Sequence, residues 1–310
     1  MAFTPTISTD LASQLVTVYA NAALQPLVSV LKMGAMVNRF YEGSFGEVGQ
    51  TLNVPLPPVF TANDLAETGT VTTQENQLTT APLTIAKHKE ASFGIPQVTQ
   101  SFTNIDLGVT YVRSAVVAVA QAVEQDLLNL YTGFTSNTAC GTGGTTLTDA
   151  VMRDARKALV KAKVPDQVQK YLVVNPDAYE AILADSALTA QYAVGFPVGQ
   201  DTPVQTGNIG QRYGLNIVEH QLVPQVTAGS PAVTTTNNIL FAPDAIMLVT
   251  RRLPPIPAGL GAVSADMDFG NFVMRLTYSY KADNLAQQWT VSCLYGCAVL
   301  RPQFGVVVKS

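Results

Sequence analysis

The chain has 310 residues, of which 47% are hydrophobic and 13% are charged, and its formal net charge is -4. This length and hydrophobic content exclude a disordered chain and support one large or two ordinary domains with a real core. The acidic balance excludes a dedicated nucleic-acid binder, because such proteins normally carry a basic excess.

The first 40 residues carry apolar side chains at helical spacing, such as Leu11, Leu15 and Val18. Pro26 would end the first helix, and a second apolar run follows it. This pattern predicts an arm of short helices.

Between residues 51 and 96 the pattern changes to strands and turns. Pro55, Pro57, Pro58 and Pro82 lack an amide donor, which restricts these strands to sheet edges or free ribbons. The polar stretch 61–80 is too long for an ordinary loop of a compact domain and is typical of a loop that binds something. We therefore expect a long projecting hairpin.

The stretch 104–133 is predicted to form one long helix, because its apolar residues recur at steps of three and four. Asn104 can cap its first turn, and Gly133 is expected to end it in a left-handed conformation. A membrane-spanning helix is disfavoured, because Arg113 and Gln121 interrupt the apolar run. We expect this helix to be the spine of the molecule.

A second unit of about 120 residues follows a Thr- and Gly-rich break, and its size is that of an ordinary domain. The pattern predicts an α+β unit with helices at 149–164 and 177–184 and strands at 171–174, 206–222, 239–241 and 245–249. Its first helix presents a basic face made of Arg153, Arg156, Lys157 and Lys161. Most such faces are simply solvated, and contact with acidic subunits or with DNA is the alternative.

The last third returns to strands, at 272–280, 289–300 and 304–308. We expect these strands to cover the spine helix, because little of that helix is charged. The chain would then leave one domain, build a second and return to the first.

The sequence holds no complete catalytic motif. Residues 43–49 and 268–270 look like fragments of a protein kinase, but the lysine strand and the His-Arg-Asp loop that a kinase requires are missing. His88 and His220 are expected to be plain surface or strand residues. The acid pairs Glu124 with Asp126 and Asp266 with Asp268 are expected to be solvated or in turns. We therefore expect no enzyme, no cofactor and no metal site.

Three cysteines, Cys140, Cys293 and Cys297, are too few and too irregular for a disulfide framework or a zinc site. We expect them to be reduced and to lie in the core. The first ten residues lack the basic start and apolar core of a secretory signal, which indicates synthesis in a reducing cytoplasm.

Six stretches resemble those of phage coat proteins in their order along the chain: VNRFYEG at 37–43, GQTLNVP at 49–55, ASFGIPQVTQS at 91–101, NPDAYEAIL at 175–183, TGNIGQRYG at 206–214 and WTVSCLYGCAV at 289–299. The chain is similar to the major capsid proteins of tailed bacteriophages, with the fold named after phage Hong Kong ninety-seven. This resemblance implies an α+β fold with an N-terminal arm (1–44), an extended β-hairpin or E-loop (45–96), a peripheral domain with the spine helix (97–145), an inserted axial α+β domain (146–265) and a returning β layer of the peripheral domain (266–310).

The resemblance also implies a function. The chain would assemble with itself into hexamers and pentamers of an icosahedral virion shell around double-stranded DNA, after synthesis in the host cytoplasm. Its expected partners are a separate scaffolding protein, a portal protein, a decoration or minor capsid protein, and DNA by weak non-specific contact. The expected contacts between subunits are Phe60, Leu65, Arg251 and Arg252. Lys87, Lys89 and Asn284 are available for the cross-links that some relatives form.

Two other functions remain open at this point. One is an encapsulin-like compartment that holds cargo protein, and the other is a metal-dependent hydrolase that uses Asp266 or Asp268.

Overall fold

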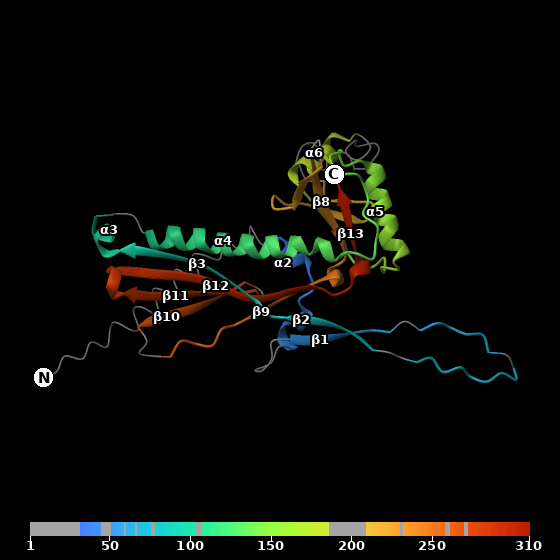
Figure 1. Cartoon of the computed structure of the whole chain (residues 1–310), viewed down its shortest axis with the longest axis horizontal. Coiled ribbons are helices and arrows are strands. Elements are labelled where there is room, and N and C mark those ends of the chain that lie inside the picture. Colours follow the sequence, from blue (N-terminus) through green and yellow to red (C-terminus); the bar gives the residue numbers. More distant parts are fainter. Residues whose placement is uncertain are drawn as a thin grey trace, which may run out of the picture.

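The computed structural model describes residues 32–44, 51–58, 60–65, 67–75, 78–102, 107–185, 209–229, 232–257, 261–269 and 272–310. The helices expected before Pro26 and the helix cap expected at Asn104 lie outside these residues. Figure 1 shows three parts: a long helix along one sheet, a second sheet with its own helices near one end of this long helix, and a projecting hairpin. The architecture is mixed α+β, as the sequence predicts.

The long helix is α4 (Leu107–Leu128, 22 residues), and the 3-10 turn η2 (Asn129–Gly133) continues it. The buried residues of α4 recur at steps of three and four and include Val112, Val116, Val119, Val123 and Leu127. The predicted helix is confirmed over 107–128, and its last five residues adopt the tighter winding that is common at helix ends.

Gly133 does not end the helix in the left-handed conformation, so that expectation is wrong: its φ is not positive. Instead Gly133 allows a close approach of β12, because a Cβ atom there would lie 2.7 Å from Cγ2 of Val299. The glycine is therefore explained by packing between the helix end and the sheet.

The first sheet is antiparallel and has the order β10-β11-β12-β3, with β9 also paired to β12. Its strands are β3 (Lys87–Pro96), β9 (Ile246–Arg251), β10 (Ala262–Phe269), β11 (Phe272–Lys281) and β12 (Ala286–Val299). β12 is long enough to pair with β3 on one side and with β11 and then β9 on the other. α4 packs along β3 and β12 (Figure 1), so the expected cover of the spine helix by strands of the last third is observed.

The second sheet has the order β13-β8-β4-β6-β5, with β7 paired to β8. Its strands are β4 (Lys170–Val174), β5 (Gln211–Arg212), β6 (Leu215–Glu219), β7 (Gln225–Ala228), β8 (Val233–Phe241) and β13 (Gly305–Lys309). The parallel pair β4 and β6 lies on either side of helix α6 (Pro176–Ala184) in the chain, and helix α5 (Asp149–Lys161) packs on β13.

Two strands pair differently from the expectation. β9, expected within the inserted unit, belongs to the first sheet, and β13, expected on the spine helix, pairs with β8 of the second sheet. Both are short strands, and their apolar runs would suit a buried position in either sheet. The sequence pattern therefore identifies these two as strands but does not select their neighbours. The pattern did not predict β10, which pairs with β11 in the first sheet.

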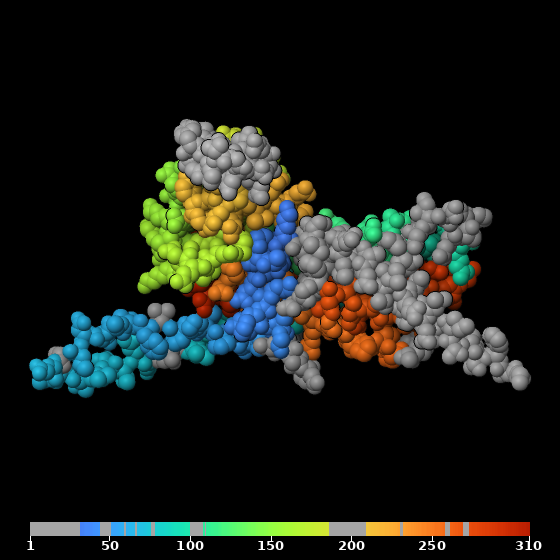
Figure 2. Space-filling view, turned by 180° about the vertical axis from the view of Figure 1, so that it is seen from behind, coloured from blue at the N-terminus to red at the C-terminus, as the bar shows by residue number. Residues whose placement is uncertain are grey.

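The hairpin is built from β1 (Thr51–Leu56) and β2 (Thr79–Thr84), which pair over six residues each. Beyond this ladder the two arms continue without strand pairing in their described residues and project far from the body (Figures 1 and 2). The hairpin base packs on a small core that contains Val54, Leu83, Ile85, Met247, Val249 and Leu300. Projection is thus observed as predicted, but regular β structure is limited to the base.

Short elements complete the fold: α2 (Met33–Met36), η1 (Phe40–Ser44), α3 (Gln97–Phe102), η3 (Pro243–Ala245), η4 (Ala282–Asn284) and η5 (Pro302–Phe304). Among the described residues, the main core joins α4, both sheets and α5, and Trp289, Tyr295 and Phe241 are its largest fully buried side chains. The two sheets are therefore parts of one packed body.

Candidate assembly surfaces

The projecting hairpin carries large apolar side chains in solvent. Phe60 is 62% exposed and Leu65 is 59% exposed, and Val71 and Leu78 are also exposed. Large exposed apolar side chains gathered on one segment are a mark of a protein interface. The structure therefore places Phe60 and Leu65 where a neighbouring molecule can reach them.

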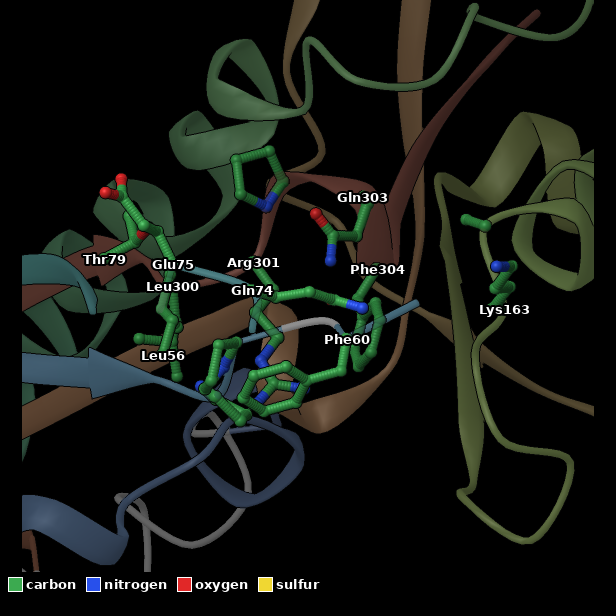
Figure 3. A pocket seen from close by; sticks show the side chains of 14 residues that line it. Leu56, Phe60, Gln74, Glu75, Thr79, Lys163, Leu300, Arg301, Gln303 and Phe304 are labelled. Atoms are coloured by element: carbon green, nitrogen blue, oxygen red, sulfur yellow. The ribbon is translucent and has the colours of Figure 1, made fainter. Parts of the chain in front are cut away.

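A cavity of about 750 Å³ lies at the root of the hairpin. Figure 3 shows Leu56, Phe60 and Gln74 of the hairpin beside Phe304, with Lys163 on the far side. Gln74 joins the two arms here, because its Oε1 accepts a hydrogen bond from the main-chain nitrogen of Thr61 at 3.0 Å. The hairpin root is thus held in shape by its own contacts.

The predicted basic face lies on the exposed side of α5. Arg153, Arg156, Lys157 and Lys161 are all exposed, and the buried residues of the helix are Met152, Ala155 and Leu159. Two of the four cations have a partner on the same helix: Arg153 lies 2.8 Å from Asp149, and Lys157 lies 3.9 Å from Asp154. The face is therefore basic and exposed to solvent, and two of its four positive charges are balanced by acidic side chains of the same helix.

Arg251 and Arg252 lie at the end of β9, and Arg252 forms an ion pair with Asp268. Asp266, two residues earlier on β10, binds the buried Arg275, whose Nε donates to it at 2.7 Å. Both carboxylates considered for a hydrolase are thus occupied by arginines. Arg252 already has a partner within its own chain, so its expected role as a contact between subunits remains a prediction.

Arg275 was not singled out by the sequence pattern, although it is only 7% exposed. Its guanidinium also donates to the main-chain oxygens of Leu253 and Pro254, at 2.5 Å each. These bonds fasten the segment after β9 to strands β10 and β11. A charged residue inside an otherwise apolar stretch of β11 was the available signal.

Glu124 and His220 form a buried junction, so the expectation that Glu124 is solvated and that His220 is a plain residue is wrong. Glu124 is 0% exposed, and its Oε2 lies 2.9 Å from Nε2 of His220. The same carboxylate accepts main-chain hydrogen bonds from Met33 at 3.0 Å and Gly34 at 3.2 Å. Three segments far apart in sequence therefore meet at one carboxylate.

The hydrogen bonds determine the form of His220. Its Nδ1 accepts a hydrogen bond from the main-chain nitrogen of Leu222 at 3.1 Å, so the ring proton lies on Nε2 and is donated to Glu124. Lys32 adds a bond from its Nζ to the main-chain oxygen of Glu219 at 3.0 Å. The junction thus fastens the segment around α2 and the end of β6 to α4.

A second polar cluster fastens α4 to the first sheet. Asp126 accepts a hydrogen bond from the hydroxyl of Tyr295 at 2.5 Å, and Nζ of Lys87 and Nζ of Lys89 lie 3.1 and 3.7 Å from it. Burial opposes ionisation of this carboxyl, but the bonds from Tyr295 and Lys87 and the charges of both lysines outweigh it and lower its pKa. The two lysines available for cross-linking are therefore paired with Asp126 in this structure.

A family model described as phage capsid protein matches residues 106–308, which is well over half of the chain. The chain belongs to the phage capsid protein family. It is thus a structural protein of the virion, and the absence of a complete catalytic motif agrees with that class.

Solved structures show the same fold as this capsid protein. A structure from Mycobacterium phage Che8 is 21% identical in sequence to this chain, and the match covers 89% of this chain and 89% of the phage chain with a TM-score of 0.66. The capsid of cyanophage Pam1 is 14% identical, covers 88% of each chain and has a TM-score of 0.64. A virus-like particle from Pyrococcus furiosus is 14% identical, covers 94% of this chain and 97% of its own, and has a TM-score of 0.51. No curated protein matches the sequence.

The structure also describes the side chains that could bind a metal ion, the cysteines and the hydropathy of the helices. Among the described residues, no group of three or more His, Cys, Asp or Glu side chains is placed to hold a metal ion. The three cysteines are unpaired, and burial raises the pKa of the Cys293 thiol to about 12.

Over the same described stretches, no helix has the length and apolar character needed to cross a membrane.

Proposed function

We propose that this chain is the major capsid protein of a tailed phage and that copies of it assemble into hexamers and pentamers of an icosahedral shell around double-stranded DNA. The observation that carries the proposal is the projecting hairpin with its exposed Phe60 and Leu65. A hairpin that leaves its own subunit can reach a neighbour, and many such contacts together stabilise a closed shell although each is weak.

The proposed division of the chain follows the family resemblance. It has an N-terminal arm (1–44), an extended loop (45–96), a peripheral domain with the spine helix (97–145), an axial domain (146–265) and a returning β layer (266–310). The observed pairings modify the division, because β9 and β10 join the first sheet and β13 joins the second.

The proposed partners are other copies of this chain, a separate scaffolding protein, a portal protein and a decoration or minor capsid protein. DNA would be contacted weakly and without sequence preference, since the chain has a net charge of -4. Arg251 and Arg252 are kept as proposed contacts between subunits, and the face of Arg153, Arg156, Lys157 and Lys161 as a surface toward DNA or another subunit.

Truncation of the hairpin's apolar side chains tests the proposal. The double variant Phe60→Ala with Leu65→Ala should keep the thermal stability of the monomer, because both side chains are exposed. It should raise the protein concentration needed for assembly about tenfold or more, because it removes apolar contact with the neighbour. Assembly is measured by sedimentation and electron microscopy.

The matched control is Leu285→Ala, since Leu285 is as exposed as Leu65, at 59% each, but lies on a turn of the body. This control should assemble like the unmodified chain. Normal assembly of the hairpin variant would contradict the proposed role of the hairpin.

An encapsulin-like compartment is the rival shell. The fold shared with the Pyrococcus furiosus particle does not separate the two, because that match shows fold alone. The content of shells purified from host cells decides: double-stranded DNA supports a capsid, and a single cargo protein supports a compartment.

A further inference from the structure

The charges of the second-sheet unit are divided between its two helices. α5 contains four basic and two acidic residues, whereas α6 contains two acidic and no basic residues. Exposed charge pairs contribute little to the free energy of folding. The separation is therefore not explained by the stability of the fold.

The basic side is a continuous exposed stripe on α5. Arg153, Arg156, Lys157, Val160 and Lys161 recur at helical spacing, and Val160 is 48% exposed although it is apolar. Within the described part of the chain, Arg156 and Lys161 have no ion-pair partner. An exposed basic stripe that includes two unpaired cations and surrounds an exposed apolar side chain is suited to a protein partner with acidic groups.

The acidic side lies on α6. Asp177 and Glu180 are one helical turn apart and exposed, while Ala178 and Ile182 of the same helix are buried. Asp177 accepts a hydrogen bond from Asn175 at 3.0 Å, and Glu180 has no ion-pair partner among the described residues. This helix thus presents negative charge that its own unit leaves uncompensated.

The two faces lie on different sides of one unit. Figure 1 shows α5 along one side of the second sheet and α6 toward the opposite side. A ring of identical subunits requires two different patches on every subunit, which one rotation brings together. Opposite charge on two such patches satisfies this requirement.

We propose that the basic face of α5 in one copy binds the acidic face of α6 in the next copy around a ring. The inference rests on the proposed function and names the partner surface within it. The hairpin leaves the body on the same side as α5 (Figure 1). A neighbour held by the hairpin therefore presents its opposite side, which carries α6, to α5.

Two other negatively charged partners of the α5 face, the hairpin of another copy and DNA, are less favoured. The hairpin of another copy carries Asp64, Glu67 and Glu75, but the hairpin of the adjacent copy points away from α5 in such a ring. DNA would suit the cations, but the α5 face has no aromatic side chain for stacking on bases and two of its cations are paired within the helix.

Charge exchange tests the proposal. One variant carries Arg156→Glu and Lys157→Glu on α5, and a second carries Asp177→Asn and Glu180→Lys on α6. Each should melt like the unmodified chain and should need roughly tenfold more protein to assemble at about 0.15 M salt, because like charges then face each other. A chain that carries all four changes should recover to within about threefold. The control, Lys281→Glu with Asp283→Lys on an exposed turn outside this unit, should assemble normally.

The outcomes separate this inference from the proposed function. If the unmodified chain forms no shells, the proposed function fails. If it forms shells and both variants assemble equally well, or if the four changes together give no recovery, the inference fails and the proposed function stands. If Asp64→Lys with Glu67→Lys restores assembly of the α5 variant, the partner of the α5 face is the hairpin of another copy and not α6. Normal shells with reduced DNA content would assign it to DNA.

Discussion

At the scale of single residues, buried polar contacts join the parts of this capsid protein. Glu124 joins α4, the segment around α2 and the end of β6 through three hydrogen bonds and lies out of solvent. The sequence did carry a signal for the burial of Glu124. It follows Ala120 by four residues and therefore lies on the apolar stripe of α4. Its partner could not be identified, because His220 lies 96 residues away and no local pattern links the two.

Glu124→Ala should lower the free energy of unfolding by about 3 kcal/mol, because it leaves buried donors without an acceptor. Gln125→Ala, at the next position of the same helix, should cost about 0.5 kcal/mol or less. Urea unfolding measures both. Together with His220→Ala, the double-mutant cycle should give a coupling energy of about 1 kcal/mol or more. Equal effects of the changes at 124 and 125 would contradict the role assigned to this junction.

Asp126 predicts how stability depends on pH. Its pKa is lower in the folded chain than in the unfolded chain, so its contribution is fully present above the unfolded value of about 3.9 and is lost as the pH falls through the folded value. Asp126→Asn should therefore be less stable than the unmodified chain at neutral pH, and the difference should shrink below about pH 4. Thermal melts over this range measure it. A difference that stays constant down to pH 2 would show that the charge of Asp126 contributes nothing.

At the scale of elements, periodicity predicted the existence of α4, α5, α6 and most strands, because each has a clear apolar face. The sequence did not predict equally well which strands pair with each other in the sheets. β12 extends beyond β11 by several residues, and β9 pairs with that extension although β10 and β11 separate the two strands in the chain. β13 completes the second sheet from the C-terminus. Such pairings depend on strand length and on free sheet edges, which appear only once the chain has folded.

The predicted assembly surfaces differ in how far the sequence defined them. The polar, proline-containing stretch indicated the hairpin, and the exposure of Phe60 and Leu65 agrees with that interpretation. The basic face of α5 also followed from helical spacing alone. In contrast, Arg252 looked like part of a free patch but pairs with Asp268 on a strand that the sequence did not place beside it.

At the scale of the whole molecule, one packed body carries a projecting hairpin. The two sheets and α4 share one core, while the hairpin extends from it with a basic helix on the same side (Figures 1 and 2). Weak contacts between subunits allow a shell to form in many small steps and to correct errors. The charged fraction of 13% leaves few like charges to oppose such contacts.

The most direct test of this account is electron microscopy with sedimentation of the purified full chain, alone and after co-expression with a phage scaffolding protein. We expect closed shells, or rings and tubes of repeating hexamers, under at least one of these conditions. A chain that stays monomeric at high concentration under both conditions would contradict the proposal that this protein builds a capsid by association with itself.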